Sequence, residues 1–348
     1  MTVAPPVPSR VLAGDIGGTH ARLALAHLDG ARIAFDRREI LAVREHAALD
    51  DALARFLGGE GPPERMCLAW AGPIDGPRAR LTNGAWEVDA DAIGARFGIA
   101  RVALVNDFHA AAAGIDVLGP GDLAVLQPAP ADPAGARLVI GAGTGLGVAY
   151  VLRDAHGSRI VAGEGGHAAF APQDDEQAAL WHDLHRQLGR VAAEHVLSGN
   201  GLVRLYRFCR RSAGLADGDA VRAVDVARRA DAGDPAARHA MHLFCSIYGA
   251  VAGDHALACM ATGGVYVAGG IAARNAARLA DGAFVEAFSA KGGHRDVMAR
   301  MPVWLVRDEL LGLRGAAALA LALPARPQAS RARTRPASGG STSASDCG

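Results

Sequence analysis

The stretch LAGDIGGTHARLALA, Leu12–Ala26, joins two apolar segments through Asp-Ile-Gly-Gly-Thr. Two glycines and a threonine between strands predict a tight turn with exposed backbone N–H groups, and successive N–H groups form a concavity that holds anions. Asp15 at the mouth of this turn would repel a phosphate unless a cation lay between them. The stretch therefore indicates a phosphate site with a divalent metal. A plain β-hairpin with a glycine turn is the alternative that this stretch alone leaves open.

A second stretch, RLVIGAGTGLGVAYVLR from residue 137, has the same outline. We expect a strand at 137–142, a Gly/Thr turn and a strand at 147–153. Two such turns can hold one polyphosphate from both sides, which favours a duplicated α/β unit. A third stretch, GGVYVAGGIAARN, ends a buried strand at Gly269-Gly270, where a ring or a ribose could approach the backbone. Tight strand–helix packing is the alternative explanation for all three glycine segments.

Polar residues follow another buried strand in RVALVNDFHAAAAGI, residues 101–115. Because ligands of open α/β sheets bind beyond the carboxyl ends of strands, we expect Asp107 to point into a cleft. Asn and Asp are also the preferred helix N-caps. One of Asn106 and Asp107 can therefore cap the helix while the other acts.

Two further segments carry polar groups that suit a sugar. GEGGHAAFAP places Glu164 and His167 among glycines, and AAEHVLSGNGL places Glu194 ahead of a Ser-Gly helix start. We expect a ligand rather than a metal to hold the first pair, whereas a solvated helix face is the alternative for Glu194. Carboxylates and imidazoles suit a ring of sugar hydroxyls. Phosphoryl transfer further needs cradled phosphates, Mg²⁺ and a base for the attacking hydroxyl.

The bulk composition excludes several other classes. The 348 residues are 50% hydrophobic and 21% charged, with zero formal net charge, so nothing points to nucleic acid or to a membrane surface. The five cysteines include no C-x-x-C pair, and the N-terminus lacks an apolar signal core. A soluble cytoplasmic protein is the expectation.

The periodicity of apolar residues predicts the elements between two tails of low apolar content. Strands are expected near 11–16, 21–28, 31–41, 66–71, 101–105, 137–142, 147–153, 264–268 and 302–306. Helices are expected near 47–57, 89–97, 108–116 and 309–323, with a mostly helical region over 174–262 and further helices up to about residue 300.

Taken together, the motifs resemble those of bacterial-type glucokinases of the hexokinase–actin–Hsp70 superfamily, from about Val11 to Leu323. The matching segments are DIGGTHARLAL, LTNGAW, VNDFHAAAAGI, GAGTGLGVA, EGGHAAFAP, EHVLSGNGLVRLY and GGVYVAGGI. The resemblance implies an α/β protein with the two-domain actin-like ATPase (ribonuclease H-like) fold, a duplicated mixed-sheet core and an interdomain cleft. It implies a small domain of residues 11–117 plus 308–323 and a large domain of 118–307, between disordered tails at 1–10 and 324–348.

The resemblance also implies a role for each matching residue. Asp107 would be the catalytic base on the sugar 6-hydroxyl, and Asp15 would lie near Mg²⁺ through water. The residues that would bind the sugar are Asn83, Asn106, Asp107, Glu164, His167 and Glu194. The residues that would bind ATP, besides Asp15, are Gly17, Gly18, Thr19, Gly143, Thr144 and Gly145 at the phosphates and Gly269 and Gly270 at the adenosine.

The implied activity is ATP-dependent phosphorylation of glucose to glucose 6-phosphate, the first step of glycolysis, by a homodimer. A kinase for fructose or mannose and a catalytically weak sugar-sensing regulator are the alternatives. His20 and His195 depart from the Asn and Arg that are frequent in the family at those positions, without removing a required group. Sugar preference, phosphoryl donor and the role of the Arg-containing tail stay open at this point.

Overall fold

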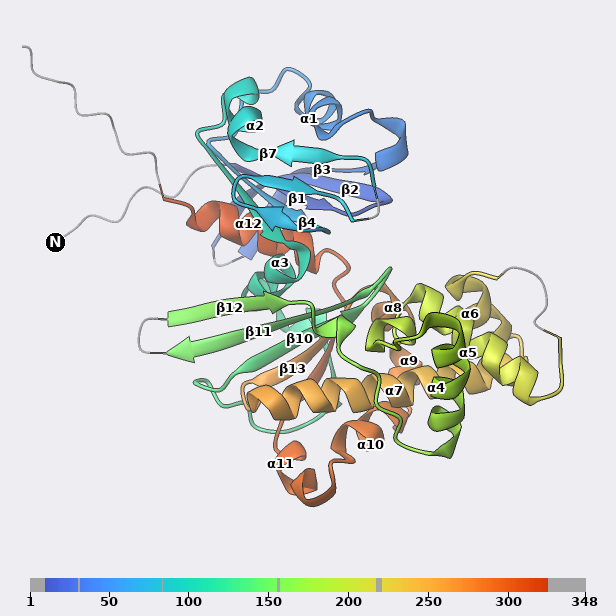
Figure 1. Cartoon of the computed structure of the whole chain (residues 1–348). Helices are drawn as coiled ribbons and strands as arrows, with labels where there is room; N and C mark the ends of the chain where they lie inside the picture. Colours follow the sequence, from blue (N-terminus) through green and yellow to red (C-terminus); the bar gives the residue numbers. More distant parts are fainter. Residues whose placement is uncertain (1–9, 31, 83, 155–156, 217–220, 325–348) are drawn as a thin grey trace, which may run out of the picture.

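The computed structural model describes residues 10–324 except 31, 83, 155–156 and 217–220. Two mixed β-sheets form its framework, each covered by helices, and helix α3 lies between them (Figure 1). The predicted tails lie almost entirely outside the described residues.

The first sheet has the strand order β3-β2-β1-β4-β8. Its strands are β1 (Val11–Ile16), β2 (His20–Asp29), β3 (Arg32–Ala42), β4 (Arg65–Trp70) and β8 (Arg101–Asn106). Strand β1 pairs antiparallel with β2 and parallel with β4, and β4 pairs parallel with β8. The carboxyl ends of β1, β4 and β8 therefore meet at one edge, where the chain places Asp15 and Asn106.

Alternate residues of β1 serve two separate apolar layers, as the pleat of a strand requires. Leu12 and Ile16 pack with helices α1 and α2, whereas Val11 and Ala13 pack with α3 and α12. These helices are α1 (Leu49–Leu57), α2 (Ala90–Phe97), α3 (Asp107–Gly114) and α12 (Leu311–Ala322). The last helix of the chain thus returns to cover the first sheet.

The second sheet repeats the centre of the first. Its order is β12-β11-β10-β13-β14-β9, and β10 pairs antiparallel with β11 and parallel with β13, as β1 does with β2 and β4. The strands are β9 (Leu123–Gln127), β10 (Arg137–Ala142), β11 (Leu146–Asp154), β12 (Gly157–Gly163), β13 (Gly264–Ala268) and β14 (Val303–Val306). The predicted duplication is confirmed.

The long helix α7 (Pro235–Cys259) lies against the second sheet (Figure 1). Tyr248 on this helix is fully buried, and its hydroxyl accepts from the N–H of Ala142 at 3.1 Å and donates to the carbonyl of Ile140 at 3.2 Å. The other helices of this half are α4 (Asp175–Leu188), α5 (Gly199–Ser212), α6 (Ala223–Asp231), α8 (Gly270–Arg274), α9 (Ala276–Leu279), α10 (Ala283–Ser289) and α11 (Arg295–Met298). Short 3₁₀ turns are η1 (Val43–Glu45), η2 (Ile115–Val117), η3 (Pro120–Asp122), η4 (Gly165–His167), η5 (Ala193–His195) and η6 (Gly292–His294).

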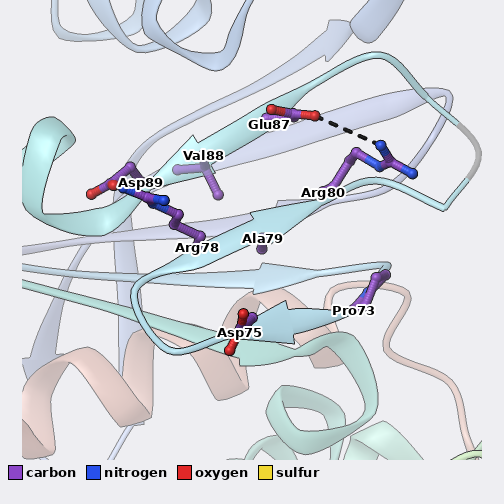
Figure 2. Close-up of a pocket in the computed structure, with 8 residues that line it drawn as sticks. All are labelled: Pro73, Asp75, Arg78, Ala79, Arg80, Glu87, Val88 and Asp89. Carbon is purple, nitrogen blue, oxygen red and sulfur yellow. Dashed lines mark hydrogen bonds and ion pairs between the residues drawn. The ribbon is translucent and has the colours of Figure 1, made fainter.

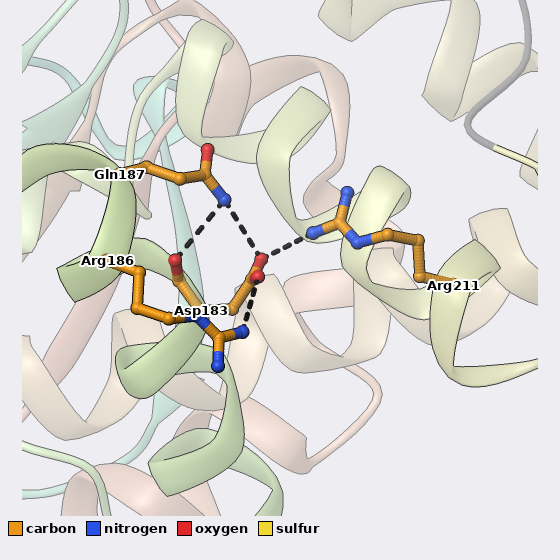
Figure 3. A network of polar contacts seen from close by, with 4 residues as sticks. All are labelled: Asp183, Arg186, Gln187 and Arg211. Atoms are coloured by element: carbon orange, nitrogen blue, oxygen red, sulfur yellow. Dashed lines mark hydrogen bonds and ion pairs between the residues drawn. The ribbon is translucent and has the colours of Figure 1, made fainter.

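A carboxylate joins the outer helices α4 and α5. Asp183 accepts from Arg186 and Gln187 on its own helix and from Arg211 on α5, as Figure 3 shows. The Asp183 side chain is 19% exposed, so this shared carboxylate is shielded more than an ordinary surface pair.

Three parts of the fold were not predicted. Strands β9 and β12 lie at the two edges of the second sheet, and a separate small sheet consists of β5 (Ile74–Asp75), β6 (Arg78–Arg80) and β7 (Glu87–Asp89). These strands are short or largely exposed, so they lack the apolar runs by which central strands are recognised. Within the described ranges, no helix combines the length and apolar character needed to cross a membrane.

Close contact between α3 and α12 gives a first prediction. A Cβ added at Gly315 would lie 1.7 Å from the Ala110 carbonyl oxygen. Gly315→Ala should therefore lower the free energy of unfolding by about 1–3 kcal/mol through overpacking, although alanine by itself favours a helix. Urea denaturation measures this loss. Gly121→Ala is the matched control because a Cβ there meets nothing within 4 Å, and equal stability of the two variants would contradict the packing argument.

Candidate active site

Asn106 and Asp107 lie where β8 runs into α3. The Asn106 side-chain oxygen accepts from the N–H groups of Phe108 at 2.9 Å and His109 at 3.3 Å, so Asn106 is the N-cap. Asp107 is the first residue of the helix, and its Oδ1 lies 2.9 Å from the Phe108 nitrogen. The expectation that one residue of this pair caps the helix is confirmed for Asn106. The Asp107 carboxylate is therefore not needed as the helix cap.

Phe108, the next residue, inserts its ring against the second sheet. Gly141 and Gly147 are register partners in β10 and β11, and a Cβ on either would lie 2.8 Å and 1.9 Å from the Phe108 ring, respectively. Helix α3 therefore packs against the second sheet, while its first residue follows directly after β8 of the first sheet. This contact was not predicted from the sequence, where a glycine within each of two apolar strands was the available signal.

Asp15 is the penultimate residue of β1 and faces its register partner Arg22 across the hairpin. The Arg22 guanidinium donates to Asp15 Oδ2 at 2.9 Å, and the Asp15 side chain is 19% exposed. Burial raises the pKa of Asp15, and the charge and hydrogen bond of Arg22 counteract that rise. Arg22 was not predicted as a site residue, although its position seven residues after Asp15 across a short turn is compatible with a cross-strand pair.

Burial and neighbouring carboxylates act together on Asp107. Burial raises the pKa of Asp107 to about 6, and the negative charges of Asp15 and Glu164 contribute to the rise. The hydrogen bond from Phe108 partly offsets it. Three of the predicted site carboxylates thus lie close enough to influence one another, although they come from two different sheets. A carboxyl with this pKa is ionised at neutral pH but is readily protonated, as a general base requires.

Each of the two glycine turns is closed by the N–H of its first glycine. In the first glycine turn (residues 17–19), the Gly17 N–H donates to the His20 carbonyl, and in the second (residues 143–145), the Gly143 N–H donates to the Gly145 carbonyl. These two N–H groups close their own turns and are not free donors. Thr19 and Thr144 are exposed, and a Cβ added at Gly143 would meet nothing within 4 Å. Space for an anion therefore remains above the second turn.

Glu194 connects a predicted sugar segment to the second glycine turn. Its Oε2 accepts from the N–H of Leu146 at 2.9 Å, and a Cβ at Gly145 would lie only 2.3 Å from the same oxygen. The alternative of a solvated helix face is therefore wrong for this residue. Position 83, predicted to bind the sugar through Asn83, lies outside the described residues.

Glu164 and His167 lie in the GEGGHA loop (residues 163–168), with side chains that are 81% and 57% exposed. The His167 Nε2 is 3.8 Å from Glu164 Oε2, so the pair is loosely associated. The loop itself is tightly seated, because a Cβ at Gly166 would lie 2.0 Å from the Leu146 carbonyl oxygen. The polar side chains are thus open to solvent above a backbone packed against β11.

Gly269 and Gly270 follow β13, as predicted. Gly269 has a φ of +90°, and a Cβ there would lie 2.5 Å from the Ala142 carbonyl oxygen. Tight packing of this turn against β10 is therefore sufficient to explain Gly269. At Gly270 the nearest group is the flexible guanidinium of Arg274, 3.1 Å from an added Cβ, so this position is bounded by a movable side chain.

A cavity of about 570 Å³ opens instead on the small sheet β5–β6–β7 (Figure 2). Its charged lining comprises two ion pairs, Arg78 with Asp89 and Arg80 with Glu87, together with Asp75. None of the predicted site residues that the structure describes lines it. We therefore do not assign the chemistry to this cavity. The described part of the chain also contains no group of three or more His, Cys, Asp or Glu side chains arranged to hold a metal.

Similarity to known proteins identifies the family of this chain. The family model described as Glucokinase matches residues 12–323. The chain belongs to the glucokinase family. The glucokinase of Nitrobacter hamburgensis is 38% identical over 312 residues, which cover 88% of this chain and 96% of the relative. That of Chromohalobacter salexigens is 39% identical over 310 residues, covering 88% and 95%.

Solved structures agree with this assignment. A glucokinase from an Antarctic psychrotroph matches with a TM-score of 0.81 and 32% identity over 90% of this chain and 98% of its own. A ROK family glucokinase from Streptomyces griseus, solved with glucose and AMPPNP, has a TM-score of 0.60 at 22% identity, covering 89% of this chain and 99% of its own, a likeness that shows the fold alone. The predicted actin-like ATPase fold and the phosphotransferase class are thereby confirmed, and the comparisons do not favour a sugar-sensing regulator.

The raised pKa of Asp107 predicts a pH-dependent stability. Because the folded-state pKa of about 6 exceeds the ordinary value of 3.8, ionisation of Asp107 costs stability as pH rises from about 4 to above 6. Asp107→Asn should therefore gain stability relative to the parent at pH 8 but not at pH 4, by on the order of 3 kcal/mol at most. Thermal unfolding at both pH values measures the difference. The exposed Asp296→Asn is the control, and an identical shift at both pH values would contradict a raised pKa.

Proposed function

We propose that this member of the glucokinase family transfers the γ-phosphoryl group of ATP to the 6-hydroxyl of glucose, with Asp107 as the general base. The observation that carries this proposal is the placement of Asp107 at the carboxyl end of β8, with a pKa raised to about 6 beside Asp15 and Glu164. At neutral pH the ionised carboxylate accepts the hydroxyl proton as the oxygen attacks phosphorus. At lower pH the protonated form loses this capacity.

Two features support binding of the ATP phosphates between the sheets. The first and second glycine turns come from corresponding hairpins of the two sheets, β1–β2 and β10–β11. With Gly17 and Gly143 engaged in closing the turns, Gly18, Thr19, Thr144 and Gly145 are the residues we assign to the phosphates, and Gly269 and Gly270 to the adenosine. The Streptomyces griseus structure was solved with AMPPNP, which agrees with a nucleotide donor.

A magnesium ion fits the charges present. Mg²⁺ is usually held by one or two carboxylates, water and substrate phosphates rather than by a cage of protein ligands. Asp15 supplies one ionisable carboxylate at the first glycine turn, and Arg22 fixes its orientation. The metal would neutralise phosphate charge, while Asp15 would hold its water shell.

The sugar is assigned to Asn106, Glu164, His167 and Glu194, with Asn83 as a further expectation. Glu164 and His167 are exposed on a loop packed against β11, and Asn106, which caps α3 through its side-chain oxygen, keeps its amide N–H₂ for a hydroxyl. A glucokinase from Balamuthia mandrillaris, whose structure has a TM-score of 0.75 at 22% identity over 90% of this chain and 94% of its own, was solved with glucose, which agrees with glucose as substrate. We also propose a homodimer in the cytoplasm, and a small domain of residues 11–117 plus 308–323 that closes on a large domain of 118–307 around the sugar.

Replacing the base tests the central assignment. Asp107→Asn keeps the shape of the side chain and removes the proton acceptor, so kcat should fall by roughly 10²-fold or more while glucose still binds. A coupled assay with glucose and ATP measures kcat, and calorimetry measures binding. Near-normal turnover would show that another group accepts the proton. The parent kcat should also fall as pH drops through about 6.

Replacing the sugar ligands tests the second assignment. His167→Ala or Glu164→Gln should weaken glucose binding at least several-fold, because each removes a polar partner of a sugar hydroxyl, and should leave AMPPNP binding nearly unchanged. Calorimetry with each ligand separately distinguishes these effects. His242→Ala, an exposed histidine on α7, is the control. Equal losses for both ligands would mean that His167 and Glu164 maintain the fold instead.

A further inference from the structure

A half-buried histidine lies directly beneath the GEGGHA loop and takes no part in the proposed chemistry. His255 belongs to α7, and its Nδ1 is 2.7 Å from the hydroxyl of Tyr150 on β11. The two rings are tilted by 52°, with centroids 6.2 Å apart. The hydroxyl therefore approaches the edge of the imidazole, which is a hydrogen bond rather than a stacked contact.

The same imidazole touches the backbone of the loop. A Cβ added at Gly165 would lie 3.0 Å from His255 Cε1 and 2.8 Å from Val148 Cβ. Gly165 thus has no room for a side chain, because the loop is pressed onto the histidine ring and onto β11. Gly166 is likewise pressed onto the Leu146 carbonyl. His255 is the contact from the helix side, and β11 supplies the others.

The hydrogen-bonding pattern fits a neutral imidazole. Burial lowers the pKa of His255, and Asp254 and a hydrogen bond to the backbone of Gly165 partly counteract this. Asp254 is itself paired with Lys291, whose Nζ lies 2.6 Å from its Oδ1. A neutral ring that accepts from Tyr150 at Nδ1 can donate from Nε2 toward the loop, so both nitrogens have partners.

We propose that His255, oriented by Tyr150, is a positioning residue. It fixes the position of the GEGGHA loop backbone and thereby directs the side chains of Glu164 and His167 toward the sugar. This inference rests on the proposed function of that loop. The two exposed side chains have only a loose mutual contact, so their position depends on the backbone that carries them. Removing the support should misplace both sugar ligands and leave the glycine turns at the phosphates in place.

His255→Phe tests this directly, since it keeps a ring of similar size and removes both nitrogens. We expect KM for glucose to rise roughly tenfold, KM for ATP to change less than twofold, and the melting temperature to stay close to that of the parent. Tyr150→Phe should have a smaller effect in the same direction. The double variant should cost no more than His255→Phe alone, because Tyr150 acts through His255. His242→Phe, at an exposed position of the same helix, should change neither constant.

Hydrogen exchange separates this inference from the proposed function. In His255→Phe, amides of residues 163–168 should exchange faster, whereas those of residues 143–146 should not, whether or not the protein acts on glucose. A parent protein inactive on glucose would refute the function alone. Unchanged exchange in the loop, equal rises in both KM values, or additive effects of the two substitutions would overturn the positioning role of the His255–Tyr150 pair.

Discussion

Packing of the Phe108 ring against Gly141 and Gly147 is the contact on which the arrangement of the molecule depends. It seats α3 on the second sheet, while the same helix continues directly from the last strand of the first sheet. The Phe108 ring leaves no room for a side chain at position 147, because a Cβ added to Gly147 would lie 1.9 Å from the ring. Asp107 immediately precedes Phe108, so its position relative to both sheets follows from that packing.

This placement has an electrostatic cost. A carboxylate held between two sheets loses hydration, and here it also faces the charges of Asp15 and Glu164, so the pKa of Asp107 rises to about 6. Arg22 relieves part of the same cost at Asp15 by pairing with it across the hairpin. Asp107 has no such cation in its pKa balance. Burial raises the pKa of both carboxylates, but only Asp15 has an adjacent arginine that counteracts the rise.

The start of β11 is a shared support for groups that the family resemblance assigns to different substrates. Leu146 directly follows the second glycine turn. Its N–H donates to the Glu194 carboxylate, and Gly166 packs closely against its carbonyl oxygen. A displacement of this one residue would move a phosphate turn and two sugar segments together. His255 and Tyr150 add support from the helix side of the same loop. Packing through glycine therefore links the sugar and nucleotide positions without any direct contact between the ligands.

The sequence by itself determined the central strands, the duplication, the glycine turns and the candidates Asp107, Asn106, Glu164, His167 and Glu194, because these features are local. Apolar runs, glycine pairs and polar residues after strands leave their mark within about fifteen consecutive residues. It also led to the family through motifs in a fixed order. The edge strands β9 and β12 and the small sheet β5–β7 were not predicted, since short or exposed strands carry a weak periodic signal.

Only the tertiary structure decided which of these residues meet. The pairing of Arg22 with Asp15, the seat of Phe108, the bond from Leu146 to Glu194 and the contact of His255 with Gly165 join elements up to 90 residues apart in the chain. The raised pKa of Asp107 likewise arises from burial and from charges on other elements. Such properties depend on distances between segments, and a linear pattern does not contain those distances until the sheets and helices have packed.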